Sequence, residues 1–510
     1  MKRFFSPSKF KSAAFLITIT SFFSYAIGLL RDRIIAVNFG TTSQTDIYNA
    51  SFLIPDSIFN FFIASALASA FLPVFSQYLD KDKEEAQKIA NTVLNGGVII
   101  ILFFSAVSFL LMPQLIEFLF PNVNTEGQKD IILMTKLMLP SAILFAISNT
   151  LGNILMSHKH FFSYAISPIL YNLGIIFGII FLQNELGIYA AAVGVLSGAI
   201  LHCIIRIIDA FFIDYKYTTK TDFKSPGFLK IIKLMIPRSA GLIAWQLNLY
   251  IFTIVGLKLI EGGISAFNFA RNIQSFAVSL FGIALSTAVF PYLASNSSED
   301  KKVDFTNYFQ TTLEKILFFT IPSAIGLMLL STPIIELLLS GGIFQKESIK
   351  LTSLILFFFA FSIPFESITH LVSRSFYAKQ NTITPTIITL ASFSLIGAIT
   401  YFIAPNYGIE WFSIGFSIGF ILQVILLLVF IRPHLKNFNT NDFIKNLSKT
   451  ILATGIMATA ILVLQPLETV IPAKIAHVLR IIIPGSVFLL TAYLLRSPEI
   501  RALKQIISRN

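Results

Sequence analysis

Two arginines in otherwise apolar stretches are the residues best suited to chemistry in this sequence. Arg31 falls inside the apolar run 13–39, and Arg271 falls inside the apolar stretch 267–294. A charge in the middle of a membrane span costs about 2.5–3.5 kcal/mol and usually faces water or a partner. The two arginines therefore indicate a polar surface, in contact with water or with charged partners, inside an apolar protein.

Both arginines are expected on helix faces that carry polar or small residues. At 100° per residue, Arg31 shares one sector with Ser21, Ser24, Gly28 and Asn38. Three further helices show a comparable face, so four helices are expected to line a central, water-filled cavity. These faces consist of Asp46, Asn49, Asp56 and Asn60; of Arg238, Gly241, Trp245 and Asn248; and of Asn268, Arg271, Ser275, Ser279, Gly282 and Ser286.

Structural roles compete with binding roles for these residues. Stripes of serine and glycine also let membrane helices pack closely. Arg31 could serve only as the ion-pair partner of Asp32 or Asp46. On a helix, Asp32 and Arg33 are expected to point away from Arg31, and Arg33 to extend toward the lipid headgroups.

The composition places the whole chain in a membrane. The 510 residues are 55% hydrophobic and 13% charged, whereas soluble domains carry about 25% charged residues. With about 20 apolar residues per spanning helix, the sequence predicts an all-α polytopic membrane protein with about fourteen spans. The predicted spans are 13–38, 47–78, 89–115, 131–156, 162–183, 187–213, 229–258, 267–294, 311–332, 351–377, 383–404, 408–431, 447–467 and 475–496. Pro55 and Pro73 are expected to break the long second span, and Arg206 and Asp209 to form a local pair near the end of the sixth.

The charged residues predict the orientation in the membrane. The net charge is +12, and the basic residues gather in alternate connectors and at both ends of the chain. By the positive-inside rule both termini are cytoplasmic, which also explains the charge without a nucleic-acid partner. A single cysteine, Cys203, and histidines without ligand spacing give no reason to expect a disulfide framework or a metal site.

An internal repeat divides the chain. Four pairs of segments resemble each other in order, each pair offset by about 220 residues. The repeat predicts two six-helix lobes in parallel orientation, 1–220 and 221–435, followed by an additional helix pair and a basic tail, 436–510. Parallel repeats are a transporter plan, with the substrate path between the lobes. The paired segments are 61–83 with 279–301, 111–120 with 331–340, 136–143 with 361–368, and 158–170 with 378–388.

The sequence does not indicate an enzyme. It has no Walker A loop, no GxSxG motif and no Ser/His/Asp set at recognisable spacing. No cofactor is expected. Transport by alternating access, with the lobes rocking about loops such as 214–228, would draw energy from a membrane potential or a monovalent cation gradient.

Residues 24–78 resemble the opening of the MurJ/MviN family, the lipid II flippases of the MOP transporter superfamily. Further matches are FNFARNIQSF (267–276), GIALSTAVFPYLA (282–294) and FYAKQNTITP (376–385). The matching motifs in the opening are Gly28-Leu-Leu-Arg31-Asp32, Phe39-Gly40, Thr45-Asp46, Ile54-Pro55-Asp56, Phe71-Leu-Pro73 and Tyr78.

The resemblance implies a fourteen-helix protein with a V-shaped cavity and a lipid-tail groove on the final helix pair. In the family, cavity arginines contact the diphosphate of lipid II; Arg31 and Arg271 match two such positions, and Asp32 and Asp46 match acidic ones. The sequence departs from the family at several positions, with Tyr25, Leu53 and Phe59 where better-known members carry basic residues, Ala64 in place of a glutamate and His370 in place of a lysine. The predicted substrate-binding residues are Arg31, Arg271, Asp32, Asp46, Asn49, Asp56, Arg238, Asn248 and His370.

The resemblance predicts a flippase of the bacterial inner membrane. It would move an undecaprenyl-diphosphate-linked peptidoglycan precursor, lipid II, from the cytoplasmic to the outer leaflet. Its partners would be this lipid-linked diphosphate, membrane lipids and cell-wall synthesis proteins. Two alternatives stay open. One is another exporter of the superfamily, which unpaired carboxylates at Asp46 and Asp56 would indicate. The other is a non-transporting membrane scaffold.

Overall fold

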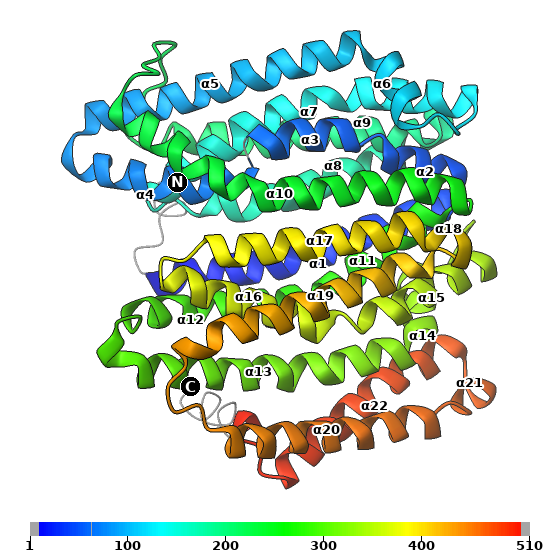
Figure 1. Cartoon of the computed structure of the whole chain (residues 1–510). Helices are drawn as coiled ribbons and strands as arrows, with labels where there is room; N and C mark the ends of the chain where they lie inside the picture. The colour runs from blue at the N-terminus through cyan, green and yellow to red at the C-terminus, as the bar shows by residue number, and fades with distance from the viewer. Residues whose placement is uncertain (1–9, 63, 501–510) are drawn as a thin grey trace. The chain divides into compact units, whose positions relative to one another are not determined.

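The described part of the chain is built from helices joined by short connections (Figure 1). The computed structural model describes residues 10–62 and 64–500, with side chains except at 10–19, 21, 61–69, 236–242 and 299. Apart from a β-bridge between Gly341 and Phe344, the regular structure of these residues is helical. The predicted all-α class is therefore confirmed. Both termini, which were expected to be cytoplasmic, lie outside the described residues.

Many of these helices are suited to cross a membrane. Among the described residues ten helical segments are long and apolar enough, or eleven if the bent pair Lys346–Ala360 and Ile363–Ala378 forms one span. Each of the ten overlaps one of the predicted ranges. The chain is therefore a multi-pass membrane protein, whereas the count of fourteen stays a prediction.

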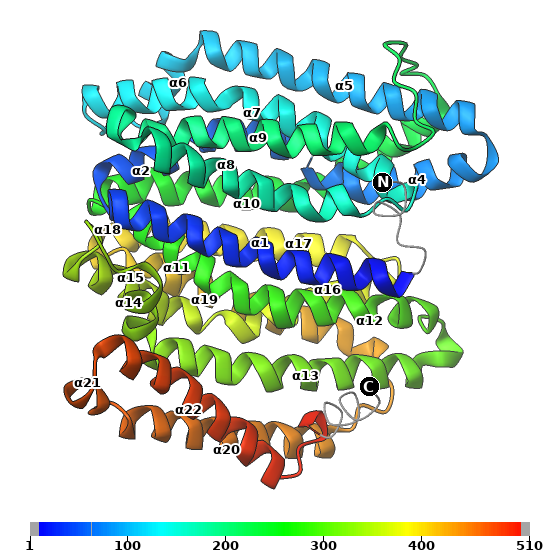
Figure 2. The ribbon, with the colours of Figure 1, turned by 180° about the vertical axis from the view of Figure 1, so that it is seen from behind.

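Residues up to Ser265 form a first compact unit. Within it, α1 packs on α8, α8 on α9, and α9 on α7, while α10 packs on α3 and α4 (Figure 2). Its helices are α1 (Phe10–Phe39), α2 (Ser43–Ala50), α3 (Leu53–Phe62), α4 (Ala64–Lys81), α5 (Lys83–Leu110), α6 (Met112–Leu119), α7 (Thr125–Ser157), α8 (Phe162–Leu186), α9 (Tyr189–Ala210) and α10 (Pro226–Leu259).

Of the two breaks expected in the second span, at Pro55 and at Pro73, only the first is found. The span consists of α2, α3 and α4, and the first interruption, at residues 51–52, comes just before Pro55 in the first turn of α3. Pro73 lies inside α4, which continues through it, so the prediction that Pro73 breaks the helix is wrong. Membrane helices tolerate an internal proline because neighbouring groups satisfy the freed backbone carbonyl.

Helices α8 and α9 are in backbone contact. Each carries two glycines four residues apart, Gly174 and Gly178 on α8 and Gly194 and Gly198 on α9. A Cβ atom added at Gly174 would lie 2.3 Å from Cα of Gly198, and one at Gly178 would lie 2.6 Å from Cα of Gly194. Small residues at this spacing let two membrane helices approach to backbone distance. The two helices therefore form the most closely joined pair of the first unit.

The connection from α9 to α10 is fastened to α5. Asn91 and Asn95 of α5 donate side-chain hydrogen bonds to the carbonyl oxygens of Lys216 (3.1 Å) and Thr218 (3.0 Å). Asn91 also accepts a bond from the Tyr215 hydroxyl at 2.6 Å. The loop that was expected to act as a hinge is thus hydrogen-bonded to α5 through two of its carbonyl oxygens and the Tyr215 hydroxyl.

Residues from Ala266 onward form the second compact unit. Its core contains the fully buried side chains of Leu293, Phe305, Phe309 and Leu371, contributed by α12, α13 and α16. Its helices are α11 (Gly263–Ala277), the π-helical turn Val278–Ile283, α12 (Ala284–Ser295), α13 (Lys302–Leu329), α14 (Ser331–Leu339), α15 (Lys346–Ala360), α16 (Ile363–Ala378), α17 (Ile383–Phe402), α18 (Ala404–Tyr407), α19 (Glu410–Ile431), α20 (Thr440–Val463), α21 (Leu467–Val470) and α22 (Ala473–Leu494), with short 3₁₀ turns at Glu299–Lys301 and Arg432–His434.

Ionic contacts fasten α22 to other parts of the second unit. The buried imidazole of His477 lies 2.7 Å from a carboxylate oxygen of Glu336 on α14 and 3.3 Å from one of Glu468 on α21. Arg480, one turn further along α22, pairs with the same Glu468 carboxylate. The final helices are thus anchored by charge as well as by apolar packing.

The order of elements follows the internal repeat. At matching positions of the repeat, a long helix is followed by a short one in both halves, as α5 with α6 and as α13 with α14. The compact units divide at Ser265 because α10 packs on α3 and α4. The division into 1–220, 221–435 and 436–510 is based on the repeat rather than on packing, and it stays a prediction.

Candidate functional site

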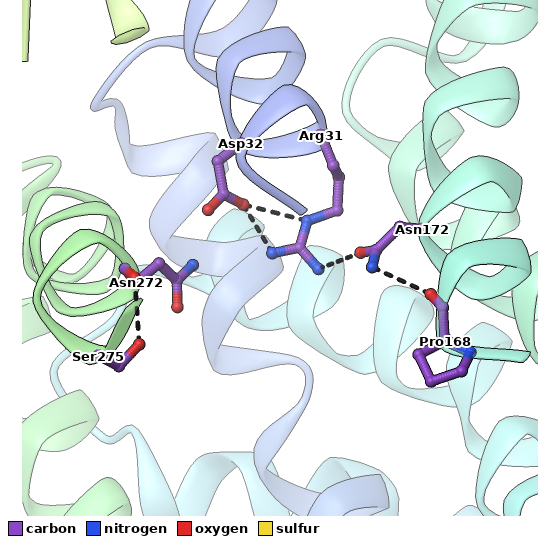
Figure 3. A network of polar contacts seen from close by, with 6 residues as sticks. All are labelled: Arg31, Asp32, Pro168, Asn172, Asn272 and Ser275. Carbon is purple, nitrogen blue, oxygen red and sulfur yellow. Dashed lines mark hydrogen bonds and ion pairs between the residues drawn. The ribbon is translucent and has the colours of Figure 1, made fainter. Parts of the chain in front are cut away.

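Arg31 is held in a polar network within the first unit (Figure 3). Its Nε and Nη2 atoms donate to Oδ1 of Asp32 at 3.0 and 2.6 Å. Its Nη1 atom donates to Oδ1 of Asn172 on α8 at 2.9 Å. The Asn172 amide is itself fixed, because its Nδ2 donates to the carbonyl oxygen of Pro168 at 3.0 Å. Arg31 is thus positioned from two helices, α1 and α8.

The expectation that Asp32 points away from Arg31 is wrong. Neighbouring residues on a helix are turned by 100°, but the arginine side chain is long enough to fold back onto the next carboxylate. The Arg31 side chain is 23% exposed and that of Asp32 is 6% exposed. The alternative of an Arg31–Asp32 ion pair is therefore the arrangement found, and the guanidinium edge stays partly accessible.

Asp46 lies at a junction of helix ends. It is 2% exposed, and its Oδ1 atom accepts bonds from the backbone N–H (2.8 Å) and the hydroxyl (2.6 Å) of Ser265. Asn49, one turn further along α2, donates to the same hydroxyl at 3.3 Å. The Asp46 carboxylate caps the first turn of α11, so it is not an unpaired cavity carboxylate.

Polar contacts join α3 to α10. Gln246 donates through Nε2 to the Ser57 hydroxyl at 2.9 Å and accepts through Oε1 from Asn60 at 3.3 Å. The predicted site residue Asn248 is buried, and its Nδ2 atom donates to the carbonyl oxygen of Ala244 at 3.0 Å.

The two remaining predicted site residues of the first unit are Asp56 and Arg238. Asp56 of α3 is exposed, and its carboxylate makes no hydrogen bond or ion pair with the described residues. Arg238 lies in α10 at a position whose side chain is outside those described. Of the three predicted site carboxylates, Asp56 is therefore the one that makes no such contact with the described residues.

The second unit places Arg271 near an acidic residue. Arg271 lies on α11 within electrostatic reach of Glu366 on α16. One turn along α11, Gln274 donates to Oε2 of Glu366 at 2.8 Å and to the Ser362 hydroxyl at 2.9 Å. His370 follows Glu366 by one turn of α16, so α11 and α16 bring a cation, a carboxylate and an imidazole into one region.

The prediction of a local Arg206–Asp209 pair is wrong. Asp209, which is fully buried, accepts from the Ser163 hydroxyl at 2.5 Å and lies 3.1 Å from Nδ1 of His160. Arg206 donates to the Ser167 hydroxyl at 3.0 Å and to the Ser148 carbonyl oxygen at 2.9 Å. The Arg206 guanidinium and the Asp209 carboxylate therefore contact residues 148–167, from α7 to α8, and not each other.

The most direct site contact absent from the sequence prediction is Asn172. It lies 141 residues from Arg31, and no local spacing links the two. A lone amide one turn after a proline, in the apolar segment SPILYNLGII, is the signal that could have drawn attention to it. Gln274 and Gln246 are also absent from the sequence prediction, because neither lies on the polar helix faces that the residue spacing defines.

Comparison with known proteins identifies the family. The family model described as "Lipid II flippase MurJ" matches residues 35–479. "Probable lipid II flippase MurJ" of Thermotoga maritima is 28% identical over 461 residues, which are 89% of this chain and 90% of that protein. "Lipid II flippase MurJ" of Thermosipho africanus is 31% identical over 436 residues, which are 85% of this chain and 87% of that protein.

Solved structures agree with this result. A structure titled "Lipid II flippase MurJ, inward closed conformation" has a TM-score of 0.81 and 29% identity, and the match covers 94% of this chain and 98% of that chain. An inward-facing multidrug-resistance MATE transporter of the MOP superfamily has a TM-score of 0.67 at 14% identity, over 80% of this chain and 93% of its own, which shows the shared fold alone. The chain belongs to the MurJ family of lipid II flippases.

Proposed function

We propose that this chain moves lipid II, an undecaprenyl-diphosphate-linked peptidoglycan precursor, from the cytoplasmic to the outer leaflet of the bacterial inner membrane. The match of the MurJ family model to residues 35–479 is the single observation that carries this proposal. Transport by alternating access requires no catalytic group of the protein.

Arg31 and Arg271 are the proposed ligands of the diphosphate. Arginine suits this role because its planar guanidinium stays charged and can donate two parallel hydrogen bonds to phosphate oxygens. The Arg31 side chain is partly exposed while Asp32 and Asn172 fix its orientation, which supports a binding role. Asn49, Asp56, Asn248 and His370 are proposed to contact the polar headgroup, and Arg238 to add positive charge.

Several features of the transport cycle belong to the same proposal. We infer fourteen spans in two six-helix lobes with an added helix pair, and both termini in the cytoplasm. The energy source is proposed to be the membrane potential or a monovalent cation gradient, without a cofactor. Cell-wall synthesis proteins are proposed as partners.

Complementation tests the proposal directly. In a bacterium depleted of its own lipid II flippase, the intact gene should restore growth, whereas Arg31→Ala and Arg271→Ala should not. Arg432→Ala serves as the matched control, because Arg432 is an exposed arginine at the end of α19. All variants must reach the membrane in equal amounts, as judged by immunoblotting.

The two possible failures have different meanings. If the intact protein is present but growth is not restored, the lipid II assignment is wrong. If growth is restored by both alanine variants as well as by the parent, the assignment stands and the roles of the arginines are wrong.

A further inference from the structure

The connection between α9 and α10 is an ordered strap rather than a free linker. The strap, residues 211–225, crosses the N-terminal half of α5, and its course beside that helix is visible from both sides (Figures 1 and 2). Gln87, the first α5 residue in contact with it, donates to the Asp214 carbonyl oxygen at 2.7 Å. At the other end, the Asp222 backbone N–H donates to the Thr92 hydroxyl at 2.9 Å. The strap is therefore held at a fixed level along α5.

That level corresponds to a membrane boundary. The Tyr217 hydroxyl donates to Oδ1 of Asn95 at 3.0 Å, and the Phe223 ring lies over Gly96. Directly beyond the strap, α5 exposes a run of large apolar side chains that begins with Ile99, which is 57% exposed. Asn95 and Ile99 are four residues apart, about 6 Å along a helix. The headgroup layer is about 5–7 Å thick on each side of the hydrocarbon core, which matches the level of Tyr217 and Phe223 in the strap.

The outer surface of the strap carries the residues that favour this layer. Lys216, Lys220 and Lys224 are exposed, and their ammonium groups make no hydrogen bond or ion pair with the described residues. Tyr217 and Phe223 expose 57% and 46% of their surface. Lysine and aromatic side chains are typical of membrane interfaces, where a charged or polar end meets the headgroups and the apolar part meets the acyl chains.

The two acidic residues of the strap do not cancel this positive surface. An Asp222 carboxylate oxygen accepts from the Lys224 backbone N–H at 3.0 Å, which forms a turn within the strap. Asp214 lines a cavity of about 200 Å³ together with His158 and Lys83, on the side of the strap that faces α4, α5 and α7. Neither carboxylate forms an ion pair with these lysines within the described residues, and the strap, with three lysines and two aspartates, keeps a net charge of +1.

We propose that the strap is a binding surface for anionic phospholipid headgroups, with Lys216, Lys220 and Lys224 holding the phosphates and Tyr217 and Phe223 seated among the lipids. The positive-inside rule assigns this end of α5 to the cytoplasmic leaflet. Basic clusters beside a span attract anionic lipids through charge, with an effect that falls as salt rises. The proposal is independent of the transported substrate.

A lipid-proximity measurement tests the proposal on the full chain. A Cys203→Ser background with Thr219→Cys gives one exposed thiol in the strap for an environment-sensitive fluorophore, because Cys203 is the single native cysteine. The labelled protein is reconstituted in phosphatidylcholine vesicles that contain equal small fractions of brominated phosphatidylglycerol or brominated phosphatidylcholine. Brominated phosphatidylglycerol should quench about fivefold more effectively, and 1 M salt should remove most of the difference.

Matched charge-removing variants decide the result. Lys216→Gln, Lys220→Gln and Lys224→Gln together should bring the quenching ratio close to one. Lys129→Gln, Lys346→Gln and Lys350→Gln remove the same charge from exposed lysines on α7 and α15 and should leave the ratio unchanged. A ratio near one in the parent protein, or an unchanged ratio in the strap variant, would overturn the proposal.

Discussion

One carboxylate oxygen of Asp46 accepts two hydrogen bonds from Ser265, a residue 219 positions further along the chain. The backbone N–H and the hydroxyl of Ser265 both point to this oxygen, and the Asp46 side chain has almost no contact with solvent. This contact fixes the start of α11 against α2. Both residues of this contact belong to the first unit.

The Asp46–Ser265 contact should contribute measurably to stability. Ser265→Ala and Asp46→Asn are each expected to lower the free energy of unfolding by about 1–3 kcal/mol, because each leaves a buried group with fewer partners. Thermal unfolding of the purified protein in detergent is the measurement. In a double-mutant cycle the two effects should be non-additive by at least about 0.5 kcal/mol. Strict additivity would show that the contact is not made in the folded protein.

Asn172 should position Arg31 for function. Asn172→Ala removes the acceptor of Nη1, so we expect reduced complementation with a near-normal unfolding temperature. Asn172→Asp offers a carboxylate in the same place and should also reduce activity, because it holds the guanidinium more strongly. Ser197→Ala is the control, since Ser197 is an exposed residue on α9 that bonds only within its own helix. Full activity of both Asn172 variants would contradict the positioning role.

Backbone contact between α8 and α9 should make Gly174 intolerant of any side chain. A Cβ atom there would meet the backbone of Gly198 at 2.3 Å, so Gly174→Leu must push the helices apart. We expect loss of folded protein in the membrane, measured by fluorescence-detected size-exclusion chromatography. Gly455 of α20 has no atom within 4 Å of an added Cβ, and Gly455→Leu should be tolerated. Equal yields of the two variants would mean that α8 and α9 are not in backbone contact.

The contacts of His477 with two glutamates should hold the final helices in place. His477→Gln removes the close contacts with Glu336 and Glu468, and we expect the unfolding free energy to fall by about 1–3 kcal/mol. Lys474→Gln, an exposed change in the same helix, is the control. Limited proteolysis of the connection at 464–472 should accelerate only in the His477 variant. Unchanged cleavage would indicate that apolar packing alone anchors α22.

Hydropathy predicted much of the fold because a membrane-spanning helix must be apolar over its whole length. The helical class and ten of the spans could be read in this way. Of the two breaks expected in the second span, the one at Pro55 was found just before that residue, at 51–52, whereas α4 continues through Pro73. The sequence placed Arg31 on a polar stripe, but its partner Asn172 comes from a distant helix. The orientation of Asp32 relative to Arg31 was predicted wrongly because the 100° helix angle gives only the direction of each Cα–Cβ bond. It does not describe how far the long arginine side chain can extend.

Arg31 already has acceptors for three of its N–H donors before any phosphate arrives. The guanidinium carries five N–H donors, so an incoming diphosphate that used more than the remaining two would have to displace Asp32 or Asn172. The net gain in free energy for those bonds is then the small difference between two sets of bonds. When the substrate leaves, Asp32 and Asn172 can re-form their hydrogen bonds with the Arg31 guanidinium. On the proposed function, this exchange keeps affinity modest and release fast, which suits a carrier that must turn over more than a receptor that must retain its ligand.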